Sequence, residues 1–251
     1  MAGTGAGYDL SPTTFSPDGR VYQVEYAMKA VENSGTAMAI CCTDGIIFAV
    51  EKFLVSKMLV PGTAKRIYPV DRTTGMAVGG MVADARQLVA RGRSEVTNWK
   101  NAYDEQMPPE VLADRIGLFV HAYTLYGAVR PFGCTVLMGC VDKDTKEPSL
   151  FTIEPSGVVF KYKGTATGKG AMAAKTEIEK LMAAPITCEE ALPQVAKILY
   201  KVHDEKDRDF ELEMSWICPG SRYQFSAVPP AILKEAEDKA KKALEDEDQD
   251  D

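Results

Sequence analysis

The chain has 251 residues, 45% of them apolar, which is enough for one large globular domain with a sizeable buried core. Six of its 36 acidic residues lie in Glu245–Asp251, and the other 30 nearly balance the 29 lysines and arginines. A body so close to neutral argues against nucleic acid as a main partner.

The cysteines, at positions 41, 42, 134, 140, 188 and 218, show neither the paired spacing of metal ligands nor the density of a disulfide scaffold. The first residues lack the charged and then apolar pattern of a signal peptide, and the apolar stretches are too short to span a bilayer. We therefore expect a reducing setting in the cytoplasm and nucleus, no membrane partner, and no metal or other cofactor.

Residues 1–17 are rich in Gly, Thr, Ser and Pro, so they cannot bury enough apolar surface to hold a fixed shape and predict a mobile leader. A short amphipathic helix is expected over 19–31, with Ser16 and Asp18 as candidate caps. The apolar positions of this helix are Val21, Val24, Met28 and Val31.

Apolar runs rich in β-branched residues predict strands, and apolar residues three or four positions apart predict helices. Thr43-Asp44-Gly45 favours a tight hairpin turn between the first two strands. The expected strands are 36–42, 45–51, 65–70, 75–80, 134–140, 148–155, 157–164, 210–218 and 222–228. The later helices are expected at 82–101, 110–126, 169–183 and 188–205, with a last one that carries Ile232, Ala236, Ala240 and Leu244 on its apolar side.

The order of these elements is strands, two helices, strands, two helices, strands and a helix. Such blocks are typical of antiparallel sheets covered by helices, so we expect an α+β fold with two sheets between helical layers. No internal linker or repeat divides the chain. We expect one domain over 18–244, followed by a solvated, disordered acidic tail over 245–251.

The segment GKGAMA, Gly168–Ala173, matches the loose dinucleotide fingerprint G-x-G-x-x-G/A, and Glu189 follows about twenty residues later. The context is wrong for that site, because the preceding VVFKYKG carries two lysines and Glu189 opens a helix. A nucleotide site therefore rests on Gly168 and Gly170 alone, and glycines that permit a tight helix start are the favoured interpretation.

The histidines, His121 and His203, lie in helical patterns without a second ligand at metal-binding spacing, which favours a structural role. Cys41 and Cys42 are adjacent on a strand and must point to opposite faces. One of them is expected in the core and the other near a surface or interface.

Thr36 is a candidate nucleophile because it follows a glycine and opens an apolar strand. An amino-terminal threonine can use its own freed amine as the base, with a lysine and a carboxylate beside it. This alternative, a self-processed threonine peptidase, requires cleavage of the bond before Thr36.

The blocks YDLSPTTFSPDGRVYQVEYAMKAV, GMVADAR, YTLYGAVRPFG and AAKTEIEKL occur in this order across nearly the whole chain. Together they resemble the signature blocks of 20S proteasome alpha subunits. The resemblance implies a four-layer αββα sandwich of the amino-terminal-nucleophile hydrolase type, and a non-catalytic ring subunit that serves ubiquitin-dependent protein degradation.

An ungapped match to the catalytic beta subunits of the same particle tests Thr36 directly. Gly35 then stands at the position of their threonine nucleophile, Glu51 at that of their aspartate and Arg66 at that of their lysine. Glycine has no nucleophile, and arginine keeps a fixed charge that cannot be tuned as a lysine's can. The resemblance therefore implies no catalytic residue, with Thr36 as an ordinary strand threonine.

The same resemblance assigns gate residues to the leader. Tyr8 and Asp9 match a Tyr-Asp-Arg triplet that links neighbouring tails, whereas Leu10 replaces its arginine. The expected partners are six other alpha subunits, the beta-ring subunits, and the carboxy-terminal tails of regulatory-particle ATPases or other activators.

Two surfaces are expected to serve these partners. Activator tails would dock in a pocket formed by Glu25, Lys65, Arg66 and Gly80, in which Arg66 binds the terminal carboxylate and Glu25 is its acidic partner. Tyr22 and Tyr26 lie on a face of the first helix apart from the valines, and tyrosines are typical anchors of protein interfaces.

Overall fold

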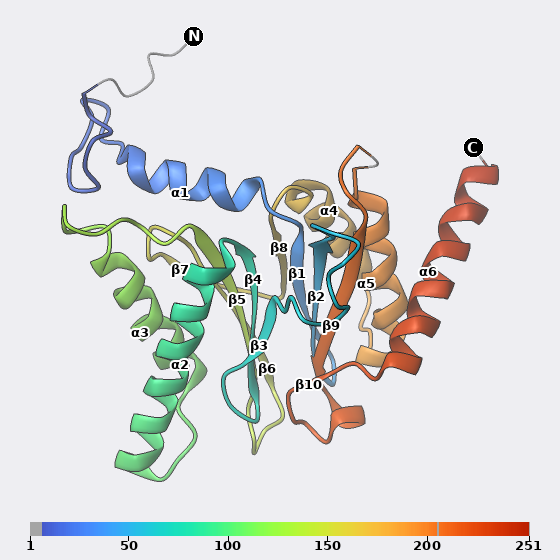
Figure 1. Cartoon of the computed structure of the whole chain (residues 1–251). Helices are drawn as coiled ribbons and strands as arrows, with labels where there is room; N and C mark the ends of the chain where they lie inside the picture. Colours follow the sequence, from blue (N-terminus) through green and yellow to red (C-terminus); the bar gives the residue numbers. More distant parts are fainter. Residues whose placement is uncertain (1–6, 205, 251) are drawn as a thin grey trace.

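The computed structural model describes residues 7–204 and 206–250, with side chains as far as Glu247 (Figure 1). Two five-stranded sheets lie face to face, and helices cover the outer side of each sheet. The helix–sheet–sheet–helix order confirms the four-layer αββα sandwich that the block order predicts.

The first sheet is antiparallel and has the strand order β10-β9-β2-β1-β8. The predicted hairpin is confirmed, because Cys42 pairs with Gly45 across the Thr43-Asp44 turn. The strands of this sheet are β1 (Ala37–Cys42), β2 (Gly45–Phe53), β8 (Gly164–Thr167), β9 (Phe210–Ile217) and β10 (Ser226–Ala227).

The second sheet is also antiparallel, with the order β3-β4-β5-β6-β7. Ile67 pairs with Ala77, which confirms the predicted second hairpin. The strands are β3 (Ile67–Pro69), β4 (Thr74–Gly80), β5 (Cys134–Val141), β6 (Pro148–Ile153) and β7 (Val159–Tyr162).

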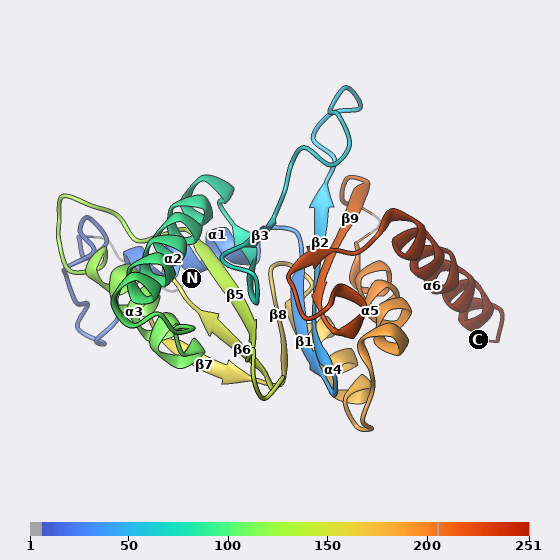
Figure 2. The ribbon, with the colours of Figure 1, turned by 90° about the horizontal axis from the view of Figure 1, so that it is seen from below.

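Helices form the two outer layers of the fold, and Figures 1 and 2 show this arrangement from two directions. α2 (Val82–Tyr103) and α3 (Pro109–Ala122) cover the second sheet. α4 (Ala171–Leu181), α5 (Cys188–Val202) and α6 (Pro230–Asp250) lie on the side of the first sheet, and a short 3-10 turn, η1 (Pro219–Ser221), follows β9. α1 (Tyr22–Glu32) crosses one end of the sandwich.

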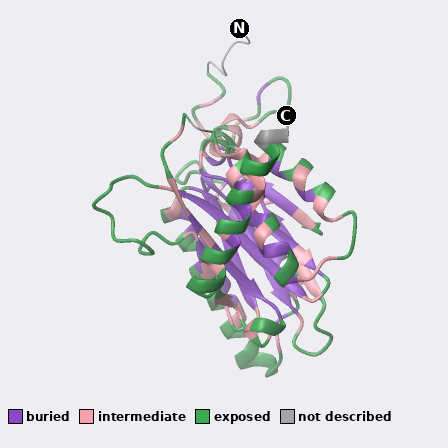
Figure 3. Ribbon diagram, turned by 90° about the vertical axis from the view of Figure 1, so that its right-hand side faces the viewer, coloured by how far each residue is buried: buried purple, intermediate pink, exposed green. Residues whose placement is uncertain are grey.

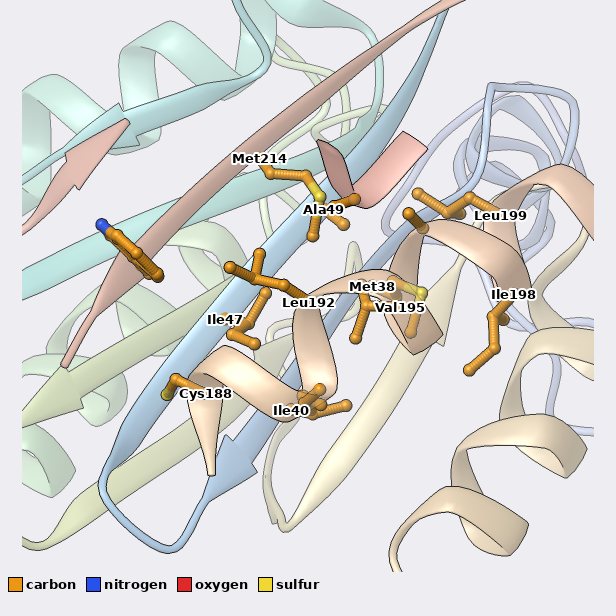
Figure 4. Packing of buried hydrophobic residues seen from close by; sticks show 14 of the residues in the cluster. Met38, Ile40, Ile47, Ala49, Cys188, Leu192, Val195, Ile198, Leu199 and Met214 are labelled. Atoms are coloured by element: carbon orange, nitrogen blue, oxygen red, sulfur yellow. The ribbon is translucent and has the colours of Figure 1, made fainter. Parts of the chain in front are cut away.

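The core follows from the alternation of side chains along the strands. Met38 and Ile40 of β1 pack against α5 (Figure 4), whereas Ala37 and Ala39 face the second sheet. Most strand residues, those of the edge strand β7 excepted, are therefore buried, whereas the outer faces of the helices and the loops are exposed (Figure 3). None of the described helices combines the length and apolar composition needed to cross a bilayer.

Cys41 and Cys42 point to opposite faces as expected. Cys42 is buried against the helices, and the half-buried Cys41 packs toward the space between the sheets. Burial raises the pKa of the Cys41 thiol to about 12, so this thiol is not activated.

The predicted helix caps are wrong. α1 begins at Tyr22, and its cap residue, Val21, makes no side-chain capping bond. Ser16 Oγ instead accepts a hydrogen bond of 3.0 Å from the Arg20 backbone N–H, which closes a turn before the helix.

The expected single strand over 157–164 is also wrong. This segment contains β7 and the start of β8, and the two strands belong to different sheets. β8 pairs with β1 through contacts such as Ala37 with Thr167, so the chain crosses between sheets at this point.

The acidic tail corrects a third expectation. α6 continues through 245–250 rather than ending at Leu244. Lys197 Nζ lies 2.6 Å from Glu247 Oε1, so a cation of α5 offsets the repulsion between neighbouring acids. Asp251, like residues 1–6 of the leader, lies outside the described residues. The described part of the leader forms turns in which Pro12 and Ser16 are buried.

Candidate functional site

Gly35 lies between α1 and β1, at the position that the sequence match assigns to a nucleophile. A β-carbon on this residue would lie 2.3 Å from the backbone carbonyl oxygen of Glu51 and 3.3 Å from its carbonyl carbon. Real β-carbons essentially never approach another heavy atom so closely. The backbone of β2 therefore closes this position to any side chain, including that of a threonine.

Thr36 is 1% exposed and is held by the surrounding chain. Its backbone N–H donates a hydrogen bond of 2.9 Å to Glu51 Oε2, and its Oγ1 accepts one of 3.1 Å from the Gly170 N–H. The amide is thus a buried peptide group and the hydroxyl stabilises a loop. This arrangement supports the interpretation of Thr36 as a strand residue.

His203 lies at the carboxy-terminal end of α5 and contacts the other oxygen of the same carboxylate. Its Nδ1 is 2.5 Å from Glu51 Oε1, and the Glu51 side chain is 3% exposed. Local sequence patterns favour a structural role for His203 but indicate no partner. The partner could not be found from spacing, since the two residues are 152 positions apart.

The loop Gly168–Gly170 packs against the segment before β1. Gly168 has a φ of +96°, and a β-carbon on it would lie 2.6 Å from the Gly35 carbonyl oxygen. The Lys169 N–H donates a hydrogen bond of 2.9 Å to the Ser34 carbonyl. Because the preceding strand β8 is antiparallel to β1, the parallel context of the nucleotide fingerprint is missing, and the glycines serve close backbone approach.

Arg66 precedes β3 and points to the end of β4. Its Nη1 donates a hydrogen bond of 2.9 Å to the Gly80 carbonyl, and its backbone N–H donates one of 2.8 Å to Glu213 Oε2. Gly80, with a φ of +96°, also donates its N–H to Ser34 Oγ at 2.8 Å. The structure therefore brings Arg66 and Gly80 together, with Lys65 exposed beside them.

Three residues that were not predicted from the sequence, Lys52, Glu211 and Glu213, support this corner. Lys52 is 5% exposed, and its Nζ lies 3.1 Å from Glu211 and 3.8 Å from Glu213. Burial raises the pKa of Glu213 and lowers that of Arg66. The available signal is the alternation of acids in FELEMSW, which puts Glu211 and Glu213 on one face of β9. Glu211 is the register partner of Lys52 on β2.

Glu25 was expected beside Arg66, but within the chain it contacts Arg20. Its carboxylate binds both Nε, at 2.6 Å, and Nη2 of Arg20, and this hydrogen-bonded pair holds the pKa of Glu25 below its usual value. Within the chain, Glu25 is therefore the partner of Arg20, and the carboxylate that contacts Arg66 belongs to Glu213.

The described leader is tied to α1. Tyr26 donates a hydrogen bond of 3.2 Å to Asp9 Oδ2, and Gln23 Nε2 donates to the Asp9 carbonyl. Tyr8 and Leu10 on either side are exposed. The ring of Tyr26 stacks on that of Tyr22 at a centroid distance of 6.2 Å.

Much of the surface of α1 is not covered by the rest of the chain. Its only buried residue is Val31, whereas Tyr26 is 42% exposed and Met28 is 36% exposed. Of the apolar positions predicted for this helix, Val31 is buried, Val21 and Val24 are half-buried and Met28 is exposed, so the chain covers the helix only in part.

Comparison with known proteins gives two family matches that meet near the end of α1. Residues 8–30 match the N-terminal signature of A-type proteasome subunits, and residues 31–217 match the family described as "Proteasome subunit". The chain belongs to the proteasome subunit family. The amino-terminal signature covers the leader from Tyr8 onward and most of α1, the two parts that lie outside the sandwich.

Relatives that match this chain over nearly its full length are named as alpha-type proteasome subunits. The chain is 55% identical over 251 residues to "Proteasome subunit alpha type-3" of Spinacia oleracea, with both chains covered completely. It is 56% identical to the protein of that name from Acanthamoeba castellanii over 97% of this chain and 96% of the relative. It is 47% identical to "Probable proteasome subunit alpha type-7" of Saccharomyces cerevisiae over 99% of this chain and 87% of the relative.

Proposed function

We propose that the chain is a non-catalytic alpha-ring subunit of the 20S proteasome core particle. The observation that carries this proposal is the closed position at Gly35, where a β-carbon would collide with Glu51. The buried amide and hydroxyl of Thr36 argue against the alternative of a self-processed peptidase, because exposure of Thr36 as an amino terminus would require removal of the whole of α1.

The partners follow from this role. The names of the relatives support assembly with other proteasome subunits, and we propose that these are six other alpha subunits and the beta-ring subunits. The uncovered side of α1 with Tyr22 and Tyr26 supports this helix as one of the contact surfaces. We place this assembly in the cytoplasm and nucleus, a setting compatible with six free cysteines.

The leader is proposed to take part in the gate of the axial pore. Asp9 is fixed on α1 by Tyr26 and Gln23, so the exposed side chain of Tyr8 is presented from an anchored point. Leu10 supplies no cation, and the gate contribution of this chain therefore rests on Tyr8 and Asp9.

The corner formed by Arg66 and Gly80 is proposed to receive the terminal carboxylate of activator tails. The guanidinium can bind a carboxylate through two parallel hydrogen bonds. One of its nitrogens already binds the Gly80 carbonyl, which fixes the direction of the others. Lys65 adds a second exposed positive charge, and Glu25 is available to a neighbouring subunit only in competition with Arg20.

Intact mass and peptidase activity of the purified chain test the proposal. We expect an unprocessed amino-terminal segment, no peptide hydrolysis by the chain alone, and co-purification with a very large assembly. A mature amino terminus at Thr36, with activity that disappears in Thr36→Ala, would show that the chain is a peptidase.

A further inference from the structure

Three buried cysteines meet where the first sheet, the start of α5 and the η1 turn join. Cys42 ends β1, Cys188 begins α5 and Cys218 follows β9. All three belong to the apolar cluster between this sheet and its helices, and their exposed fractions are 5%, 0% and 1%. Sequence spacing could not show this cluster, because its members come from three different elements.

The hairpin turn between β1 and β2 holds two of these cysteines. Ile46 pairs with Ile217, so Cys218 lies beside Gly45 on the neighbouring strand. A β-carbon on Gly45 would lie 2.9 Å from the Cys218 α-carbon and 3.0 Å from its β-carbon. The Cys188 N–H donates a hydrogen bond of 2.8 Å to Asp44 Oδ1, on the residue before that glycine. One tight turn thus fixes both Cys188 and Cys218.

The thiol groups themselves are neighbours. The Cys188 thiol lies within hydrogen-bonding reach of the sulfurs of Cys218 and Cys42, and Figure 4 shows Cys188 at the start of α5, beside β2. The Cys218 sulfur also accepts hydrogen bonds from the backbone N–H groups of Ser221 and Gly220. The bond from Cys188 and these backbone bonds stabilise the thiolate and lower the pKa of Cys218, whereas the shared bond raises the pKa of Cys188.

Cys218 lies directly beneath an exposed turn. Pro219 and Gly220 are exposed, and a β-carbon on Gly220 would lie 3.5 Å from Cys218 Sγ. Arg222 and Tyr223, which follow in the same turn, have positive φ values of 56° and 55°. Such strain in residues other than glycine makes local opening of this turn less costly than opening of a strand. A small neutral oxidant such as hydrogen peroxide can reach the sulfur through such an opening.

We propose that Cys188 and Cys218 form a redox site, in which a reversible disulfide closes when the chain meets hydrogen peroxide. The contact between the two sulfurs carries the proposal, and the site does not depend on the ring-subunit role. Disulfides in a reducing compartment are usually transient, and a reactive thiol beside a second thiol that resolves its oxidised form is typical of redox sensors.

Atoms and electrons balance with hydrogen peroxide as the oxidant. The Cys218 thiolate attacks one oxygen of the peroxide and breaks the O–O bond, which leaves a sulfenic acid on Cys218. The departing hydroxide takes up the proton that the thiol released and leaves as water. The Cys188 sulfur then attacks the Cys218 sulfur, the S–O bond breaks, and the second hydroxide leaves as water with the Cys188 proton. The two thiols thereby give two electrons to one peroxide.

Peroxide treatment of the reduced, full-length chain tests the proposal. We expect loss of two of the six free thiols and their return after treatment with dithiothreitol. Trypsin, which cuts after lysine and arginine, places Cys188 in 181–197 and Cys218 in 209–222, and each of these peptides has a single cysteine. Mass spectrometry without reduction should find the two peptides joined. In a chain unfolded by urea before peroxide is added, the preference for this pair should disappear.

Serine variants separate the roles of the two thiols. In Cys188→Ser, oxidation should stop at a Cys218 sulfenic acid, which the reagent dimedone labels. In Cys218→Ser, labelling of Cys188 should be about tenfold weaker, because the thiolate that attacks the peroxide is missing. Cys41→Ser is the matched control, since half-buried Cys41 points away from this cluster, and it should form the same disulfide as the parent.

Retention of all six thiols in the folded parent chain, or a disulfide between any other pair, would overturn the proposal. Equal labelling of the two serine variants would overturn the assignment of Cys218 as the attacking thiol. A preference for the same pair in urea would show that the folded contact does not select it. The peptide map of the parent requires no substitution, so it remains decisive where a serine variant misfolds.

Discussion

The α-carbon of Gly35 and the carbonyl oxygen of Glu51 approach so closely that a β-carbon between them would lie 2.3 Å from the oxygen. The contact joins the segment before β1 to β2, and both are buried. A side chain at position 35 would therefore clash with the backbone of the neighbouring strand. That backbone cannot move aside as a flexible side chain could.

Gly35→Ala should therefore destabilise the chain by about 1–3 kcal/mol, the usual cost of overpacking a well-filled interior. Denaturant unfolding of the full-length chain measures the loss. Gly127→Ala is the matched control, because the nearest atom to its β-carbon would be Ser11 Oγ at an ordinary 3.7 Å. Equal stability of the two variants would mean that the nucleophile position is open after all.

Asp84 at the start of α2 predicts a pH dependence. Its two oxygens accept hydrogen bonds of 2.6 and 2.8 Å from Arg130, and this pairing holds the pKa of Asp84 below its usual value. The stability it contributes is fully present well above the unfolded pKa of about 3.9. That stability is lost as the pH falls through this value toward the lower pKa of the folded chain.

Asp84→Asn should destabilise the chain by about 1 kcal/mol at neutral pH, a modest value because Arg130 is largely exposed and water screens the pair. Unfolding measured from pH 7 down to about pH 3 should show the difference between variant and parent shrinking below the unfolded pKa. Asp114→Asn, on an exposed position of α3 without an ion pair among the described residues, serves as the control. A difference that grows on acidification would contradict the assignment.

Most of the fold could be predicted because its helices and strands carry strong local periods. α2 and α5 have clear apolar stripes, and the β1–β2 turn has a residue pair that favours it. β8 could not be predicted, since Gly164–Thr167 consists of small and polar residues whose pairing with β1 is a tertiary contact. The helical course of 245–250 was missed for a similar reason, because Lys197 of α5 partners Glu247.

Fewer of the contacts in the candidate site could be predicted from the sequence. Arg66 and Gly80 could be paired only through a family resemblance, and their contact joins residues 14 positions apart. The alternation of Glu211 and Glu213 was visible, but their partner Lys52 is identified only by the β2–β9 register. Glu25 was expected as the acidic partner in the pocket, and within the chain its carboxylate binds Arg20, five residues earlier.

The tyrosines of α1 should matter for assembly more than for folding. Replacing Tyr22 and Tyr26 together with Ser should reduce incorporation into rings while stability changes little, because both side chains are at least partly exposed. Native gel electrophoresis of reconstituted particles measures incorporation. Tyr26→Phe is the control, since it keeps the ring and removes only the bond to Asp9. Normal assembly of the double variant would remove α1 from the interface.

The leader should control passage through the pore without contributing to the core. Deletion of Met1–Leu10 should leave ring assembly intact and raise basal hydrolysis of peptides, because the described bonds of Asp9 go only to α1. A smaller increase is expected for Asp9→Ala, which loses the bond from Tyr26 but keeps Tyr8 in place. Hydrolysis that is unchanged in both variants would indicate that other subunits alone close the gate.

The role of Arg66 is tested by removing its charge in assembled particles. Arg66→Gln should weaken the binding of activator tail peptides at this seam about tenfold or more, because a charged hydrogen bond to the terminal carboxylate is lost. Arg66→Glu should weaken it further, although a second carboxylate beside Glu213 adds local repulsion. Lys65→Gln removes the same charge from the adjacent exposed position and should have a smaller effect, because Lys65 is not fixed by Gly80.

Fluorescence anisotropy of a labelled tail peptide measures affinity, and uncapped peptidase activity should stay constant in all three variants. Tail peptides that bind Arg66→Gln and the parent equally well would show that Arg66 only braces the end of β4.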